Sequence, residues 1–243
     1  MKIIIHPRYA HLTAFLEELP QRFRTEGRTI YSGRNEIRIF EAGQLKLVAK
    51  SFRKPHIFNQ IAYSFFRPSK AERSYGHAVR LLEKGIDTPA PVAYIEDYRG
   101  GLLAASYYIA VYKEYPGLLR ELDFRPLEEV RELVEAFAHF TADLHNKGVL
   151  HIDYSPGNIL YKHENGQYSF CIVDLNRMKF TGVNMKTGCF NLRKLWATDE
   201  IMTCIARIYA ADRRFDAEKC ISLTLSAFRK FWEKREKKKR KRK

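Results

Sequence analysis

A short polar loop near the middle of the chain carries side chains that could perform phosphoryl-transfer chemistry. Asp153 and Asn158 lie five residues apart in the run His-Ile-Asp-Tyr-Ser-Pro-Gly-Asn, and a second carboxylate, Asp174, follows an apolar run. Phosphoryl transfer uses one carboxylate that accepts the proton of the attacking hydroxyl, together with an Asn and an Asp that hold a metal ion. The three residues therefore form a candidate set, with Asp153 as base and Asn158 and Asp174 as Mg²⁺ ligands.

The spacing of these residues resembles the catalytic-loop and metal-binding signatures of protein kinases. Pro156 and Gly157 supply a turn that lets one loop present both polar groups. The alternative is a loop of structural polar residues in which Asp153 caps a helix. His151, which opens the loop, is expected to be a scaffold residue hydrogen-bonded to backbone and not the base.

A hairpin should bring the two metal ligands together. Residues 159–161 and 168–173 have the pattern of strands, and Glu164-Asn165-Gly166 between them is a hairpin turn signal. Such a hairpin would set Asn158 at the entry of one strand and Asp174 at the exit of the other.

Alternating apolar residues over 29–52 predict antiparallel strands, with a turn at Ala42-Gly43-Gln44. Lys50 closes a Val-Ala-Lys sequence and is close to the strand lysine that holds ATP phosphates in kinases. The alternative for Lys50 is a strand-edge lysine that faces water. Ser32 and Gly33 fall where a phosphate-covering loop is expected, although a single glycine is a weak signal.

Glu72 has two interpretations. It belongs to a helix predicted over 69–84, which Gly85 and the following prolines end. Its carboxylate could pair with Lys50, as in kinases. Alternatively, Ser69 and Glu72 form a capping box, in which Glu72 bonds the first amides of its own helix.

The chain is expected to divide after a strand that ends at Tyr112. The Pro-Gly pair that follows is typical of a hinge, and the backbone of Lys113, Glu114 and Tyr115 would meet an adenine ring. We therefore predict an N-lobe over 1–112, a C-lobe over 113–228 and a basic tail over 229–243. Other expected helices are one over 10–24 disrupted at Pro20, one from Pro126 to Asn146, and two over 192–209 and 217–232.

The chain carries a formal net charge of +15, which is unevenly spread. The tail over 229–243 holds eleven Lys or Arg against two Glu, and this leaves the rest only moderately basic. The tail suits anionic lipid headgroups, with nucleic acid as the less favoured partner. The four cysteines have no metal-ligand spacing, and no apolar run spans a bilayer. These features predict a soluble, cytosolic protein that is at most peripheral to a membrane.

Residues 51–68 form an insertion rich in basic and aromatic side chains. A lipid surface or an acyl-bearing substrate would suit this mixture. A packed helix that covers the N-lobe would suit it as well, and aromatic stripes are more often core.

Together these motifs resemble the lipopolysaccharide kinase family, protein-kinase-like bacterial enzymes that phosphorylate Kdo or heptose sugars. The resemblance runs from about Ile30 to Phe180 and rests on Val48-Ala49-Lys50, the segment from Ser69 to Pro91, Leu144 to Gly148, the His151–Asn158 loop and Asp174-Leu-Asn-Arg. It implies an α+β, two-lobed fold with a small antiparallel-sheet N-lobe and a mainly helical C-lobe.

The resemblance also implies an ATP- and Mg²⁺-dependent kinase that acts on a sugar hydroxyl of a lipopolysaccharide core or lipid A precursor. Asp153 is then the base, and Asn158 and Asp174 hold Mg²⁺. Lys50 binds ATP, and Glu72 supports Lys50. Two departures stand out: Ser155 replaces the lysine that serine/threonine kinases place two residues after the base, and Asn176 replaces the glycine of D-F-G. The rival hypotheses are an atypical protein kinase of the RIO type and a pseudokinase that only binds.

Overall fold

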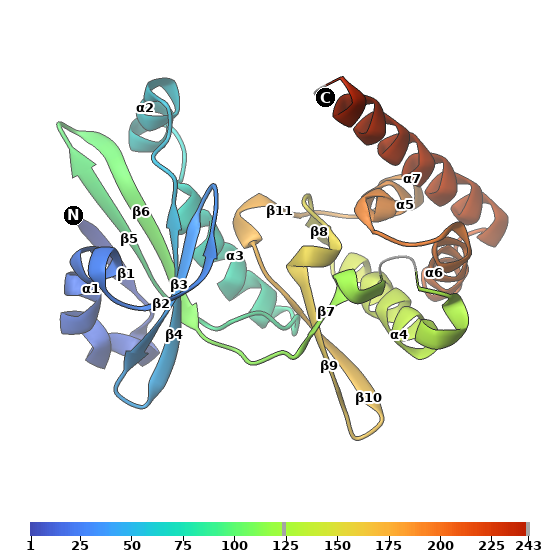
Figure 1. Ribbon diagram of the computed structural model, residues 1–243, viewed down its shortest axis with the longest axis horizontal. Coiled ribbons are helices and arrows are strands. Elements are labelled where there is room, and N and C mark those ends of the chain that lie inside the picture. The colour runs from blue at the N-terminus through green and yellow to red at the C-terminus, as the bar shows by residue number, and fades with distance from the viewer. Residues whose placement is uncertain (123–124, 242–243) are drawn as a thin grey trace. The chain divides into compact units, whose positions relative to one another are not determined.

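The computed structural model describes residues 1–122 and 125–241, which form two compact units, Met1–Glu114 and Tyr115–Lys243. Each unit has its own sheet and helices (Figure 1). Among the described helices, none combines the length and the apolar character that crossing a membrane requires.

Unit 1 is built on an antiparallel sheet of six strands. Its order is β1-β5-β6-β4-β3-β2, and the strands are β1 (Lys2–Ile5), β2 (Arg28–Ser32), β3 (Glu36–Ala42), β4 (Leu45–Phe52), β5 (Pro91–Arg99) and β6 (Leu102–Val111). The predicted turn at Gly43 joins β3 to β4, so that prediction is confirmed. Lys50 stands opposite Tyr108 on β6, and Tyr108 stands opposite Tyr94 on β5. Directly opposed residues share a sheet face, so these three side chains form one row.

Helices cover both faces of this sheet (Figure 1). They are the 3₁₀ turn η1 (Pro7–Leu12), α1 (Thr13–Thr25), α2 (Ile57–Phe65) and α3 (Lys70–Glu83). The buried face of α1 packs against Leu47 and Ile109, whereas Ala71 of α3 packs on the opposite face with Phe52 and Tyr94. Lys50, on the same strand face as Phe52, therefore points to the α3 side.

The expectation that Pro20 disrupts the first helix is wrong, because α1 continues through Pro20 to Thr25. Proline in a helix interior costs roughly 3 kcal/mol. The completely buried Leu16 and Leu19 and the nearly buried Phe23 lie at helical spacing on both sides of the proline. Their packing on the sheet offsets this cost and keeps the last turn helical.

Unit 2 is mainly helical, with short strands that carry the loops. Its helices are α4 (Leu127–Asn146), α5 (Met185–Asn191), α6 (Asp199–Asp212) and α7 (Ala217–Arg240), with 3₁₀ turns η2 (Leu119–Leu122), η3 (Pro156–Asn158), η4 (Leu175–Arg177) and η5 (Leu192–Lys194). Strands β7 (Gly117–Leu118), β9 (Ile159–Glu164) and β10 (Gln167–Ile172) form one sheet, and β8 (Val149–His151) pairs with β11 (Met178–Phe180).

The predicted helix over 126–146 is confirmed as α4, which buries its apolar face and carries two glutamates in its first turn. The single helix expected over 192–209 is wrong. The chain instead leaves η5 at Leu195 and restarts at Thr198, whose hydroxyl accepts a hydrogen bond from the backbone N–H of Ile201. This N-cap and the buried side chain of Leu195 fix the break.

Candidate active site

The candidate catalytic loop begins at the end of β8, a short strand that pairs with β11. His151 ends β8 and lies opposite Met178 of β11. The backbone N–H of Ile152 then donates to the carbonyl of Arg177, which prolongs the pairing by one bond. The loop therefore leaves the strand pair at Asp153.

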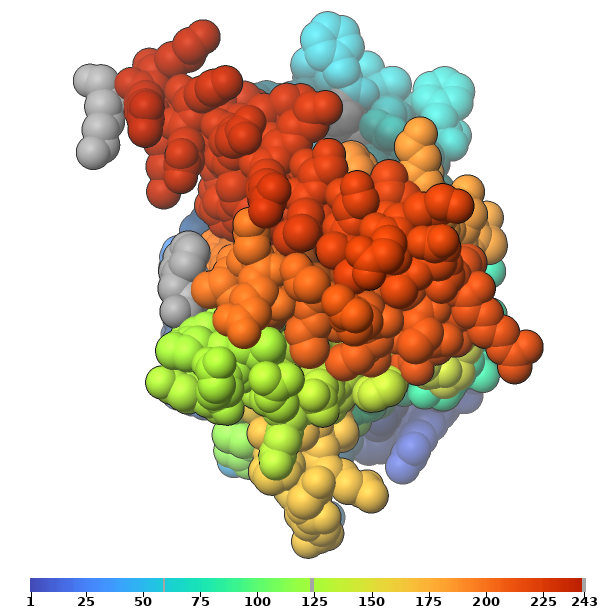
Figure 2. Space-filling model, turned by 90° about the vertical axis from the view of Figure 1, so that its right-hand side faces the viewer, coloured from blue at the N-terminus to red at the C-terminus, as the bar shows by residue number. Residues whose placement is uncertain are grey.

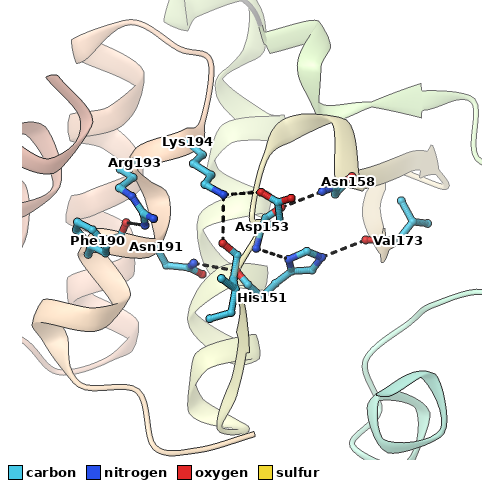
Figure 3. A network of polar contacts seen from close by, with 9 residues as sticks. His151, Asp153, Asn158, Val173, Phe190, Asn191, Arg193 and Lys194 are labelled. Carbon is cyan, nitrogen blue, oxygen red and sulfur yellow. Dashed lines mark hydrogen bonds and ion pairs between the residues drawn. The ribbon is translucent and has the colours of Figure 1, made fainter. Parts of the chain in front are cut away.

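His151 is a scaffold residue, as the sequence predicted. Its side chain is completely buried, and its Nδ1 accepts a hydrogen bond from the N–H of Asp153 at 3.0 Å (Figure 3). Because Nδ1 accepts, Nε2 carries the ring proton and donates it to the carbonyl of Val173 at 3.1 Å. Burial lowers the pKa of His151, so the ring stays neutral. The ring thus links the catalytic loop to the end of β10.

Asp153 forms an ion pair that the sequence did not predict. The Nζ of Lys194 contacts Asp153 Oδ1 in a short hydrogen bond and lies 3.3 Å from the carbonyl oxygen of Ile152 (Figure 3). The Lys194 side chain is 19 % exposed and the Asp153 side chain 38 % exposed. The carboxylate is thus accessible from solvent while the ammonium is mostly covered.

The charges around Asp153 decide its protonation state. Burial alone would raise the pKa of Asp153, but the hydrogen bond and the positive charge of Lys194 outweigh burial, and His151 and Arg177 add to this. The net result is a pKa below the ordinary value of an aspartate. Asp153 is therefore an ionised carboxylate at neutral pH.

The predicted hairpin brings Asn158 and Asp174 together. Strands β9 and β10 pair antiparallel, and Asn165 and Gly166 both have positive φ at the turn. At the open end, the N–H of Val173 donates to the carbonyl of Asn158 at 3.0 Å. The predicted hairpin is confirmed, with Asn158 directly before β9 and Asp174 shortly after β10.

These two side chains fit a magnesium ion. Asn158 Nδ2 donates to the carbonyl of Asp153 at 2.9 Å, and this orientation leaves the amide oxygen for a cation. Asp174 adopts the left-handed conformation with φ of 59°, and its Oδ1 accepts a hydrogen bond from Asn176 at 2.7 Å. A carboxylate and an amide oxygen are the hard ligands that Mg²⁺ prefers.

A buried relay of hydrogen bonds holds the loop from the opposite side. Asn191 at the end of α5 donates from Nδ2 to the carbonyl of His151 at 2.9 Å, and its Oδ1 accepts from His145 Nε2 at 3.2 Å. The other ring nitrogen of His145 accepts from the hydroxyl of Tyr209 at 3.0 Å. Burial lowers the pKa of His145 to about 4. The relay is thus built from neutral groups that connect α4, α5 and α6 to the loop.

Lys194 reaches Asp153 because two elements fix the turn that carries it. Lys194 ends η5, directly after α5, and the indole N–H of Trp232 on α7 donates to the carbonyl of the next residue, Leu195, at 3.1 Å. In the sequence Lys194 is an ordinary lysine 41 residues from Asp153. The sequence offers only an indirect signal, since Ser155 stands where serine/threonine kinases place a lysine.

The predicted nucleotide-binding residues of unit 1 have the following positions. Lys50 lies on β4, with Nζ 5.3 Å from the centre of the Phe52 ring. Glu72 opens α3, and its N–H donates to Ser69 Oγ at 3.1 Å, which is the N-cap half of the capping box. The Glu72 charge also acts on Tyr94, on the face of the sheet to which Lys50 points. Capping and pairing are therefore compatible roles for Glu72.

The remaining predicted residues lie at the ends of strands. Ser32 ends β2, and Gly33 follows it, where a Cβ would come within 2.6 Å of the Tyr31 hydroxyl. Lys113 forms an ion pair with Asp87, and Glu114 is the last residue of unit 1. Tyr115 begins unit 2, where the Lys162 Nζ lies 5.9 Å from the centre of its ring.

The antiparallel sheet of unit 1 and the loop and hairpin of unit 2 are the elements expected of a phosphotransferase with a protein-kinase-like fold. A family model described as "Lipopolysaccharide kinase (Kdo/WaaP) family" matches residues 25–203, and the chain belongs to this family of kinases. The predicted family, the fold class and the assignment as a kinase are thereby confirmed. Membership of a kinase family implies the use of ATP.

A solved structure with a TM-score above 0.5 agrees with this fold. The structure titled "WaaP in complex with acyl carrier protein" is 18 % identical, with a TM-score of 0.65, and the match covers 98 % of this chain and 99 % of that chain. The kinase domain of PknI from Mycobacterium tuberculosis is 14 % identical, with a TM-score of 0.46 over 83 % of this chain and 94 % of that chain. A search of the curated proteins found no match.

Proposed function

We propose that this chain transfers the γ-phosphate of ATP to a sugar hydroxyl of a lipopolysaccharide core or lipid A precursor. The observation that carries the proposal is the ionised Asp153 beside Lys194, one loop away from Asn158 and Asp174. Family membership supports the class of acceptor. The reaction forms a bond between the sugar oxygen and the γ-phosphorus and breaks the bond to the bridging oxygen of ADP.

In this proposal Asp153 orients the sugar hydroxyl and takes its proton. Lys194 bonds Asp153 Oδ1, so Oδ2 can accept a hydrogen bond from the hydroxyl. A carboxylate with a lowered pKa is a weak base. Such a base suits a reaction in which the sugar hydroxyl loses its proton late, after the bond between the γ-phosphorus and ADP has largely broken. Asp153 therefore acts first by positioning and only then as a proton acceptor.

In this proposal Lys194 supplies the positive charge that a lysine at the position of Ser155 supplies in serine/threonine kinases. An ammonium at this place can hydrogen-bond an oxygen of the transferred phosphoryl group while it remains beside the carboxylate. Because the Lys194 side chain is only 19 % exposed, its charge is poorly screened by water. We infer that Lys194 stabilises the transition state and keeps Asp153 ionised before it.

Asn158 and Asp174 would hold the magnesium ion, which neutralises charge on the β- and γ-phosphates when bound. Lys50, supported by Glu72, would hold the phosphates from unit 1. Ser32 and Gly33 would cover them, and the backbone of Lys113, Glu114 and Tyr115 would meet the adenine. The position of Lys50 on the α3 face of the sheet, where Glu72 exerts its charge, supports the pairing of these two residues.

We place the enzyme at the cytoplasmic face of the inner membrane, where a lipopolysaccharide precursor is available. The basic tail is the last part of α7 through Arg240, and its lysines are exposed. In Figure 2 the side chains of this red segment project from the surface. Such a tail suits anionic headgroups, with nucleic acid as the less favoured partner. Residues 242 and 243 of the tail lie outside the described residues.

The test is phosphate transfer from labelled ATP to core-sugar acceptors, to lipid A precursors and to a mixture of proteins. Asp153→Asn should lower turnover by several orders of magnitude and leave ATP binding intact. Asp143→Asn removes a comparable aspartate, in an exposed ion pair with Lys147, and is the matched control.

Near-normal turnover in Asp153→Asn would refute the role of this residue. Transfer to protein but not to sugars would favour an atypical protein kinase of the RIO type. Magnesium-dependent ATP binding without transfer to any acceptor would favour a pseudokinase.

A further inference from the structure

Helix α2 is packed with its polar side toward the sheet. The Gln60 side chain is 8 % exposed and donates from Nε2 to the carbonyl of Pro55 at 2.8 Å. Ser64, one turn later, donates its hydroxyl to the carbonyl of Gln60 at 2.7 Å and accepts the N–H of Leu103 on β6 at 2.9 Å. Polar groups thus attach α2 to unit 1, which reverses the usual arrangement of a surface helix.

Five large apolar side chains of α2 and its C-cap consequently face solvent, whereas Tyr63 is half-buried. They are Ile57 (51 % exposed), Phe58 (84 %), Ile61 (40 %), Phe65 (65 %) and Phe66 (81 %). In Figure 1, α2 projects beyond the sheet of unit 1, and Figure 2 shows side chains of this cyan region standing out from the surface. Isolated apolar residues are common on surfaces, but four gathered on one short helix, with a fifth at its C-cap, mark an interaction site. This finding bears on the question left open for residues 51–68, because a packed helix does form there, but its phenylalanines are exposed and are not part of the core.

The charged side chains in the sequence around this apolar face are all basic. From Ser51 to Ala71 the sequence contains no Asp or Glu, whereas Arg53, Lys54, Arg67 and Lys70 are basic. Arg53, Lys54 and Arg67 are exposed. The guanidinium of Arg67 also lies 5.1 Å from the centre of the Tyr63 ring. A partner that fits this surface is apolar at its centre and anionic around it.

We propose that α2 is a membrane-docking helix that inserts its phenylalanine side chains into a bilayer rich in anionic lipid. A bilayer interface combines an apolar interior with anionic headgroups, and helices with aromatic and basic residues bind there. The aromatic side chains project outward, which suits insertion into a yielding lipid layer. The proposal concerns binding alone, so it goes beyond the kinase reaction and does not depend on the acceptor.

The test is cosedimentation of the full chain with vesicles of phosphatidylcholine alone or with phosphatidylglycerol added. The wild-type protein should bind the anionic vesicles at least tenfold more tightly. The variant Phe58→Ser/Phe65→Ser/Phe66→Ser should bind them at least tenfold more weakly, because each buried phenylalanine contributes strongly. Arg53→Gln/Lys54→Gln should weaken binding several-fold at low salt.

Two controls separate α2 from other apolar and basic surfaces. Ile30→Ser/Tyr31→Ser removes exposed apolar residues of β2, on the same unit, and should leave vesicle binding unchanged. Lys237→Gln/Lys238→Gln/Lys239→Gln removes charge from α7 and should leave the apolar contribution of α2 intact. Unfolding midpoints of all variants should match the wild type, because these side chains are exposed.

Unchanged vesicle binding in the triple phenylalanine variant would overturn the proposal. If the variant lost binding to a soluble acyl-carrying protein while vesicle binding persisted, α2 would be a protein-docking face instead. The assay contains neither nucleotide nor acceptor, so its failure would leave the proposed kinase activity standing.

Discussion

At the scale of single residues, the central feature is an aspartate and a lysine that meet from distant parts of the chain. Asp153 alone would be a half-covered carboxylate on an open loop. Lys194 keeps it ionised and, by a second hydrogen bond to the carbonyl of Ile152, fixes the loop backbone beside it. Both effects depend on the same ammonium group, so they can be removed together.

We expect Lys194→Met to lower turnover by about 10²–10³-fold, the loss typical of removing one charge-stabilising donor. The acid limb of the pH–rate profile should also move to higher pH, since burial raises the pKa of Asp153 once Lys194 no longer lowers it. Steady-state kinetics from pH 4 to 8 measure both effects. Lys186→Met, an exposed lysine on α5, is the control. An acid limb that does not move would contradict the assigned ion pair.

The sequence led to Asp153, Asn158 and Asp174 because all three lie within one loop and one hairpin. Spacing along the chain determines their geometry, through a Pro-Gly turn and an Asn-Gly hairpin. It contains no information about Lys194, which reaches the loop through η5 and a hydrogen bond from α7. A charge supplied across the fold can be recognised from sequence only as a gap in the motif, and here the gap was Ser155.

At the scale of elements, α5 holds the catalytic loop only because its backbone lies very close to the Tyr209 side chain of α6. Gly188 lies in this contact, and a Cβ there would come within 1.9 Å of the Tyr209 hydroxyl and 3.3 Å of His145 Nδ1. These are two members of the hydrogen-bond relay that ends at the carbonyl of His151. The absence of a side chain at this position therefore allows the relay to form.

Gly188→Ala should destabilise the protein by about 1–3 kcal/mol, the usual cost of overpacking. It should also reduce activity, because the added methyl group displaces Tyr209 or α5. Gly182→Ala is the matched control, since no atom lies within 4 Å of its added Cβ. Urea unfolding monitored by tryptophan fluorescence gives the two stabilities. Equal urea midpoints for Gly188→Ala and Gly182→Ala would show that α5 can move without loss of stability.

Helix α2 shows that a sequence can predict an element without predicting which of its faces is buried. Its aromatic residues lie at helical spacing, and this pattern ordinarily predicts a buried face. The orientation was decided by Gln60 and Ser64, whose hydrogen bonds to Pro55 and Leu103 require positions that the sequence does not show.

At the scale of the whole molecule, the fold depends on histidines that must remain neutral. His145 is 1 % exposed, and its pKa is lowered by burial to about 4, against 6.5 in an unfolded chain. A depressed pKa gives stability that is present above pH 6.5 and is lost as the pH falls toward 4, because the unfolded chain binds the proton first. The His151 pKa is lowered in the same direction.

We expect protonation of His145 alone to lower the free energy of unfolding by about 3 kcal/mol when the pH falls from 8 to 4. Denaturant titrations at several pH values measure this slope. His145→Gln should be less stable at pH 8 and should lose about 3 kcal/mol less on acidification. The same pH dependence in both proteins would mean that the ring is not held neutral.

The hairpin that carries Asp174 has a consequence for control of the enzyme. Asp174 is held by Asn176 through its side chain, and its backbone is joined to Asn158 through the neighbouring Val173. We infer that a carboxylate restrained in this way keeps one position, so that no signal acts by moving it. The output of such an enzyme would then be set by how much acceptor the cell delivers.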